Sequence, residues 1–203
     1  MAWTFGAGTG DDMSLTGPSV GGDNGHTLMT GWFKITTFTA GRGLWSSGNV
    51  FALALSGTTE LTLTADNVTT DGVWTTTTAG LVVDTWYFIA VYAVTENTGA
   101  LMAVRFWVGT AGTPPVLCTA SQTTAPVGNF TASTANTIGN VGTGTVAFQG
   151  QIENVTVMQA GSLAINAWDT LGTTGVIAAS VETEVQNRFV IPRWRGDNIH
   201  WLL

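Results

Sequence analysis

Short apolar runs alternate with turn-forming residues along most of the chain, at the spacing of about 8–12 residues that is typical of β-sandwiches. The first clear run covers residues 27–35, and the runs 50–56 and 60–65 predict a hairpin. Residues 85–92 combine aromatic and branched side chains, which indicates a central strand covered on both faces, and residues 103–108 follow it. The pattern predicts an all-β, antiparallel sandwich.

A second hairpin is predicted over residues 137–157. Its first strand ends at Ile138-Gly139, a glycine-rich turn follows, and its second strand alternates, with Phe148, Gly150 and Ile152 on one face. A glycine inside a strand, such as Gly150, indicates that another backbone or a large ring lies against it.

Four motifs follow one another along residues 27–158. They are Gly31-Trp32-Phe33-Lys34, the strand from Trp86 to Tyr92, Trp107-Val108-Gly109, and Ile138-Gly139 with Phe148-x-Gly150-x-Ile152. In these motifs the chain resembles the LamG-like, concanavalin A-like jelly-roll family of lectins and glucanases, although the Asn that the family carries in the third motif is missing. The resemblance implies a jelly-roll sandwich over residues 1–160. Residues 161–203 are then a C-terminal extension that packs on the sandwich or on a neighbouring subunit.

Length and composition fit one domain that associates with other molecules. The 203 residues suffice for a single sandwich, and 44% of them are hydrophobic while only 9% are charged. Interspersed charge is what normally keeps soluble proteins apart, so this surface is poorly protected against association. The net charge of −7 and the single lysine, Lys34, exclude the clustered basic residues that nucleic-acid binding needs.

The sequence contains neither a signal-peptide pattern at its start nor an apolar run long enough for a membrane span. We therefore expect synthesis in a host cytoplasm and no membrane partner, with release as part of a particle. Cys118 is the single cysteine, which excludes an intramolecular disulfide and is typical of a small buried apolar residue.

Catalytic residues are not predicted. Retaining glucanases of this jelly-roll type place two carboxylates about 5–5.5 Å apart on one strand face, and the family motif is E-x-D-x-x-E. Glu182 and Glu184 alternate but lack the Asp and the third acid, and His26 and His200 stand apart from any nucleophile motif. We expect no enzyme activity and no cofactor.

A metal site is not predicted either. Asp11, Asp12 and Asp23-Asn24 carry the oxygen ligands that calcium prefers. The same residue types are common in turns, and the turn interpretation is favoured here.

The tryptophans divide into two groups. Trp32, Trp86 and Trp107 fall at positions that are core positions in the family, whereas Trp45 and Trp74 lie in Gly- or Thr-rich segments that are interpreted as loops. Because the apolar faces of sugars pack on aromatic rings, Trp45 and Trp74 are the predicted carbohydrate-binding residues.

The C-terminal segment combines aromatic, basic and apolar residues, and an apolar terminus has to be covered by its own fold or by a neighbour. Arg and Trp are enriched at interface hot spots. We predict contact with a neighbouring subunit through Phe189, Trp194, Arg195, Trp201, Leu202 and Leu203.

Together these features favour a structural protein of a bacteriophage virion. The specific hypothesis is a capsid decoration (cement) protein, a homotrimer on the exterior of the capsid. It would bridge subunits of the major capsid protein or other virion proteins. The alternative is a lectin-like carbohydrate-binding module of a phage fibre or tail that recognises glycan on a cell surface.

Overall fold

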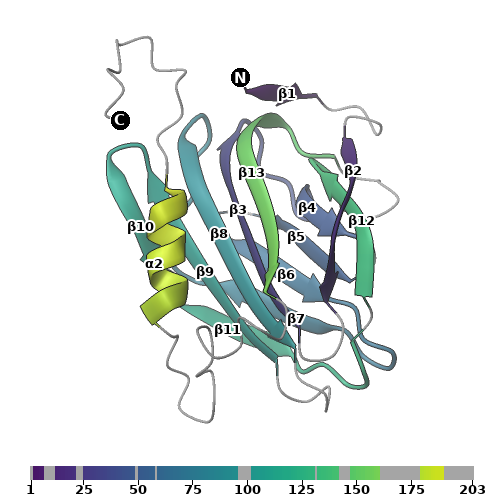
Figure 1. Cartoon of the computed structure of the whole chain (residues 1–203). Helices are drawn as coiled ribbons and strands as arrows, with labels where there is room; N and C mark the ends of the chain where they lie inside the picture. The colour runs from purple at the N-terminus through teal and green to yellow at the C-terminus, as the bar shows by residue number, and fades with distance from the viewer. Residues whose placement is uncertain are drawn as a thin grey trace.

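Two antiparallel sheets pack face to face in this computed structural model, and the helix α2 (Ala179–Arg188) lies outside them (Figure 1). The structure describes residues 2–6, 12–21, 25–48, 50–57, 59–95, 102–130, 132–141, 147–160 and 179–189. The arrangement confirms the predicted all-β sandwich.

The first sheet has six strands, in the spatial order β1-β13-β3-β8-β9-β10. The bounds of its strands are β1 Trp3–Phe5, β13 Gly150–Ala160, β3 His26–Ile35, β8 Trp86–Thr95, β9 Met102–Thr110 and β10 Thr113–Leu117. Strands β8 and β9 pair from Tyr87 opposite Thr110 to Thr95 opposite Met102.

The second sheet has seven strands, in the spatial order β11-β7-β6-β5-β4-β12-β2. The bounds are β11 Ala120–Thr124, β7 Gly72–Thr76, β6 Leu61–Ala65, β5 Phe51–Leu55, β4 Gly43–Ser47, β12 Ala132–Ile138 and β2 Met13–Gly21. Residues Phe51–Leu55 pair with Leu61–Ala65, which confirms the first predicted hairpin.

The main core lies between the sheets. In β5, β6 and β7 every second residue is buried and the residues between them are partly exposed, so each strand turns one face inward. The inner faces of both sheets contribute large side chains, among them Met29, Phe33, Trp45, Leu53, Leu63, Trp74, Phe106 and Phe148.

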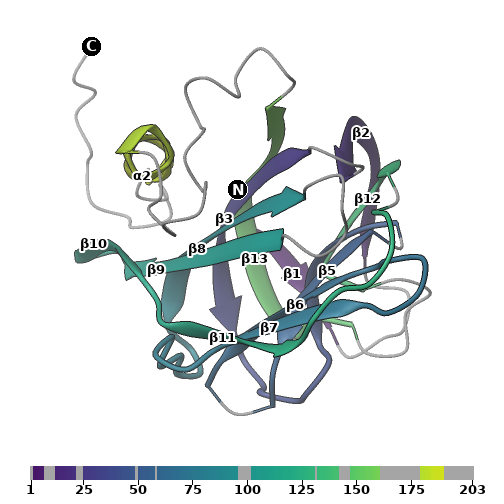
Figure 2. The same cartoon turned by 90° about the horizontal axis from the view of Figure 1, so that it is seen from below.

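Strands β3 and β8 differ because they are buried on both faces. Their outer faces belong to a second apolar cluster, which includes Val185 of helix α2, Ala179–Arg188. Figure 2 shows α2 on the side of the six-stranded sheet that faces away from the seven-stranded sheet. The prediction of a doubly covered strand at residues 85–92 is thereby confirmed.

The predicted hairpin over residues 137–157 is wrong. Strand β12 pairs with β2 and β4 in the seven-stranded sheet, whereas β13 pairs with β1 and β3 in the six-stranded sheet. The chain changes sheets after Gly139, whose φ is +85° and whose N–H donates to the carbonyl of Leu44 (2.9 Å). A glycine-rich spacer suits such a crossing as well as a tight turn, so the sequence pattern did not separate the two.

The prediction for Gly150 is confirmed. Its φ is +149°, and a Cβ at this position would overlap the carbonyl oxygen of Lys34 and lie 3.0 Å from Cε1 of Phe148. Strand β13 therefore approaches β3 closely at the point where Gly150 lies opposite Ile35.

Candidate binding face

The outer face of the six-stranded sheet carries an unusual concentration of aromatic side chains. In β3, Met29 and Phe33 point into the main core, and Leu28 and Trp32, at the alternate positions, point to the outer face. We call this surface the aromatic face and define it by Leu28, Trp32, Trp86, Phe88, Ala90, Tyr92, Val94 and Trp107.

The pairing of the strands places small side chains among the large rings. Trp32 lies opposite Phe88 in one row, and Thr30 lies opposite Ala90 in the next. On the neighbouring strand Trp107 also lies opposite Ala90. Large rings thus stand beside the small side chains of Thr30 and Ala90. The surface of the face is therefore uneven, with raised rings next to lower positions.

Helix α2 covers part of this face through few side chains. Val185 is fully buried in the cluster, and Phe189, directly after the helix, is partly buried against it. Gln186 Nε2 donates to the carbonyl oxygen of Pro115 in β10 (2.9 Å). The opposite side of the helix is solvated, with an ion pair between Glu184 and Arg188 (2.6 Å).

Polar groups also belong to the aromatic face or border it. Nδ1 of His26 and the hydroxyl of Tyr92 lie 2.7 Å apart in a buried hydrogen bond. Trp107 is fully buried, yet within the described part of the chain its indole Nε1–H has no acceptor. A buried donor without an acceptor is costly, so it marks a place where an acceptor is expected.

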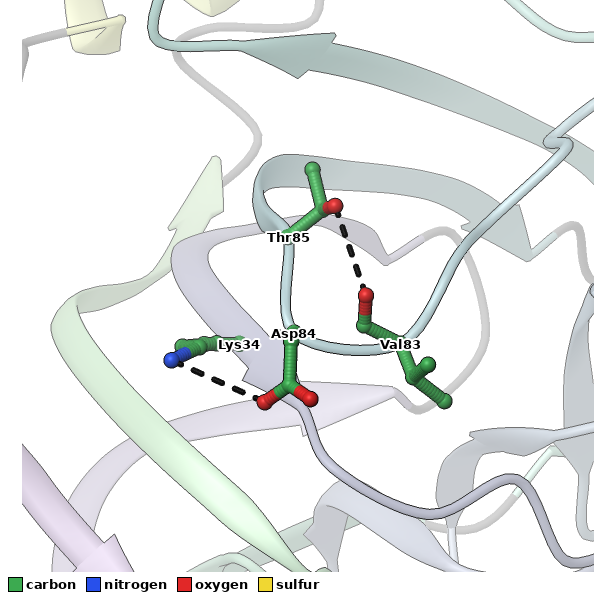
Figure 3. Close-up of polar contacts among 4 residues, drawn as sticks. All are labelled: Lys34, Val83, Asp84 and Thr85. Carbon is green, nitrogen blue, oxygen red and sulfur yellow. Dashed lines mark hydrogen bonds and ion pairs between the residues drawn. The ribbon is translucent and has the colours of Figure 1, made fainter.

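One end of the face is bordered by charge. Lys34 lies opposite Trp86, and its Nζ is 3.6 Å from Oδ1 of Asp84, as Figure 3 shows. Asp84 has a left-handed backbone (φ +60°), and its N–H donates to the carbonyl of Ile35 (2.7 Å). Because the carboxylate is well exposed, this ion pair contributes little to stability and mainly sets the polarity of the rim.

The predicted carbohydrate residues Trp45 and Trp74 are in the wrong place. Both lie within strands, not loops, and they are 1% and 5% exposed in the main core. Trp45 Nε1 donates to Oδ1 of Asn136 (3.2 Å), and the ring of Trp74 fills the space that Gly72 leaves open. Both rings are enclosed between the two sheets, so neither can stack on a sugar unless the sheets separate.

The assignment of the other three tryptophans is also corrected. Trp32, Trp86 and Trp107 do not face the main core but the outside of the sheet, under α2. The sequence contains a signal for this arrangement: β3 and β8 have large apolar residues at both odd and even positions, so each strand needs a cover on both sides.

The predicted interface residues divide into one that the structure places and five that it does not. Phe189 packs on its own sandwich, with ring centroids 5.4 Å from Trp32 and 5.5 Å from Phe88. For this ring, contact with a neighbouring subunit is replaced by contact with the chain's own apolar face. The remaining residues of the prediction, Trp194, Arg195, Trp201, Leu202 and Leu203, lie outside the described residues.

The outer face of the seven-stranded sheet has the opposite character. One row of paired residues crosses all seven strands, and none of its members is charged or larger than valine. The row runs through Ser14, Thr137, Ser46, Ala52, Thr64, Val73 and Thr124. Along this row the face carries neither a charge nor an aromatic ring.

Chemistry-bearing groups are scattered over the rest of the described chain. Glu182 and Glu184 lie on helix α2 rather than on a strand, and no cluster of three potential metal ligands occurs among the described residues. Asp11, Asp23 and Asn24 lie outside them. The helix that the structure describes is too short to cross a bilayer.

Cys118 is buried, as the sequence indicated. Burial, followed by the nearby Glu60 carboxylate, raises the pKa of its thiol from 9.0 to about 11. Glu60 is itself held by the hydroxyl of Thr76 and the N–H of Ala79, which donate to its Oε2 at 2.5 and 2.9 Å. The thiol therefore stays protonated, and unreactive as a nucleophile, at neutral pH.

This shift predicts a loss of stability in alkali. Between pH 9 and 11 the unfolded thiol loses its proton while the folded thiol keeps it, so the free energy of unfolding falls as pH rises, by about 2–3 kcal/mol in all. Urea unfolding across this range, compared with Cys118→Ala, isolates the contribution. Parallel curves for the two proteins would contradict it.

Comparisons with known proteins identify the fold. The binding domain of botulinum neurotoxin serotype G is similar over 77% of this chain and 39% of its own, with a TM-score of 0.51 and 7% identity. This likeness shows the fold, which is a jelly-roll sandwich.

Two further similar structures have lower scores. They are domains LG4–5 of the mouse laminin α1 chain (TM-score 0.46, 14% identity, 77% of this chain and 40% of that one) and a pentraxin from Limulus polyphemus (0.44, 10%, 86% and 84%). The chain thus spans about two fifths of the toxin and laminin chains. No protein-family model and no curated protein sequence matches it.

Proposed function

We propose that this protein is a non-catalytic, lectin-like module that binds glycan through the aromatic face. The observation that carries the proposal is the gathering of Trp32, Trp86 and Trp107 with Phe88 and Tyr92 on one outer sheet face. These side chains are at most 8% exposed, so a saccharide reaches them only after the cover of the face has moved away.

The chemistry of the face suits a saccharide. A sugar ring presents apolar C–H groups that pack on aromatic rings, together with hydroxyls that need hydrogen-bond partners. The face offers both kinds of group, because the indole N–H of Trp107 and the His26–Tyr92 pair belong to the same surface or its border. Binding sites for small ligands combine apolar lining with a few placed polar groups in this way.

The fold agrees with a binding role. The similar structure with the highest TM-score reported above is itself a binding domain. Fold likeness alone does not establish activity, so the proposal depends on the face and not on the neighbour.

A glycan array probed with the full chain and with Phe189→Ala tests this function. We expect binding to neutral oligosaccharides, lost on Trp86→Ala and kept in Thr62→Ala, a matched control on the outer face of the other sheet, where Thr62 pairs with Thr75. Absence of binding by both the full chain and Phe189→Ala, with each shown to be folded, would overturn the proposal.

Capsid decoration on the virion exterior is a second proposal, supported by the uncharged outer face of the seven-stranded sheet. A face without charge opposes association weakly. Co-purification with particles supports it, and a chain that stays free of particles during infection contradicts it.

A further inference from the structure

Phe189 packs on two rings of the aromatic face. Its centroid lies 5.4 Å from Trp32 with the two planes tilted by 32°, and 5.5 Å from Phe88 in an edge-to-face arrangement. Trp32 and Phe88 themselves stand 5.7 Å apart. The three rings form one aromatic cluster, and Phe189 is the member that comes from outside the sheet.

The described contacts of α2 with the sandwich are few for the area it overlies. They consist of the buried Val185, the partly buried Phe189 and one hydrogen bond from Gln186 to Pro115. A ten-residue helix with one apolar stripe has little stability of its own. Its position therefore depends on these contacts.

Trp107 provides an independent indication of a ligand. It is fully buried on the same face, and its Nε1–H meets no acceptor in the part of the chain that the structure describes. The two side chains of the cover that pack into the aromatic cluster, Val185 and Phe189, are apolar and cannot accept this hydrogen bond. A saccharide supplies oxygens where the phenyl ring of Phe189 supplies none.

We propose that Phe189 is an internal occupant of a saccharide subsite and that α2 is a strap that must leave before glycan binds. The inference rests on the proposed function and adds its regulation. The ligand is a neutral saccharide whose apolar ring face replaces Phe189 on Trp32 and Phe88. Trp107 donates its indole N–H to an oxygen of that saccharide and thereby contributes to specificity.

The test uses the full chain with cellotetraose, maltotetraose and arabinotetraose as probes in isothermal titration calorimetry. Phe189→Ala removes the occupant, and we expect it to bind a probe at least 10-fold more tightly than the parent chain. Val185→Asp loosens the strap without changing Phe189, and we expect a gain in the same direction. Val127→Ala, at an exposed position in a distant loop, is the matched control and leaves the affinity unchanged.

Trp107→Phe keeps an aromatic ring but removes the donor and part of the ring volume. In the Phe189→Ala background we expect it to lower the affinity of the folded protein about 10-fold, the effect of losing one hydrogen bond, in addition to the stability loss that a smaller buried ring causes. A loss of stability with the affinity of the folded protein intact would overturn its assignment as a donor.

The outcomes separate the inference from the function on which it rests. Equal affinity of the parent chain and both strap variants for a probe would overturn the strap and leave glycan binding standing. Absence of binding to all three probes and to the glycan array, by every folded variant, would overturn both.

Discussion

Gly150→Ala will unfold the protein or destabilise it by about 3 kcal/mol or more. Two effects add at this position. The φ of +149° is a conformation that side chains rarely adopt, and the new Cβ would overlap the carbonyl oxygen of Lys34, a backbone atom fixed in the pairing of β13 with β3. Because this pairing joins β1 and β13 to the rest of the sheet, a small local shift of the backbone cannot relieve the strain.

Gly80→Ala is the matched control. Gly80 also has a positive φ, +58°, but nothing lies within 4 Å of a Cβ built there. It therefore bears only the backbone penalty of about 1–2 kcal/mol. Urea unfolding curves for the two variants measure the difference, and equal losses would show that the close approach of β13 to β3 has been misassigned.

Trp45→Ala has the second largest expected effect, a loss of about 3–5 kcal/mol in the free energy of unfolding. The ring is 1% exposed, stacks near Phe51 and holds the buried Asn136 through its Nε1–H. Removal leaves both a large cavity and an amide oxygen without its donor. The loss is one of stability, whereas a surface carbohydrate residue would lose only binding.

Trp45→Phe separates these contributions, because it keeps most of the volume and gives up the bond to Asn136. We expect an intermediate loss, with saccharide affinity of the folded protein unchanged. Denaturant midpoints and calorimetry of the same samples check both statements. A variant of Trp45 that is fully stable but does not bind would restore the loop interpretation.

The strand pattern of the sequence was informative because alternation reports directly on one-sided burial. Residues 50–65 and 85–110 formed the strands and pairs that their patterns predicted. Gly150 was interpretable for a related reason, since few conditions other than close approach favour a glycine inside a strand. These features are local, and local pattern determines them.

Two features could not be predicted from local sequence: the sheet that each strand joins, and the face of the sheet to which each tryptophan points. The segment after Ile138 crosses between sheets instead of turning back, and a short glycine-rich spacer permits either path. Trp32 and Phe33 are neighbours in sequence on opposite faces of β3, so which of them enters the main core depends on what covers the other side. That cover, α2, is separated from β13 by a long stretch of sequence.

Phe189 illustrates the same dependence. The sequence marked it as an apolar residue in need of a cover, and the structure provides that cover within the chain, on Trp32 and Phe88. Contact with a neighbouring molecule through Trp194, Arg195, Trp201, Leu202 and Leu203 remains a prediction.

The most direct test of the central claim, that the aromatic face binds glycan, is to follow the indole Nε1–H resonances of 15N-labelled Phe189→Ala protein during titration with a saccharide that binds it. Each tryptophan contributes its own signal, and single Trp→Phe variants assign them. We predict that the signals of Trp32, Trp86 and Trp107 shift with added saccharide while those of Trp45 and Trp74 stay in place. Saturable shifts confined to Trp45 and Trp74, or to neither group despite binding, would contradict the claim.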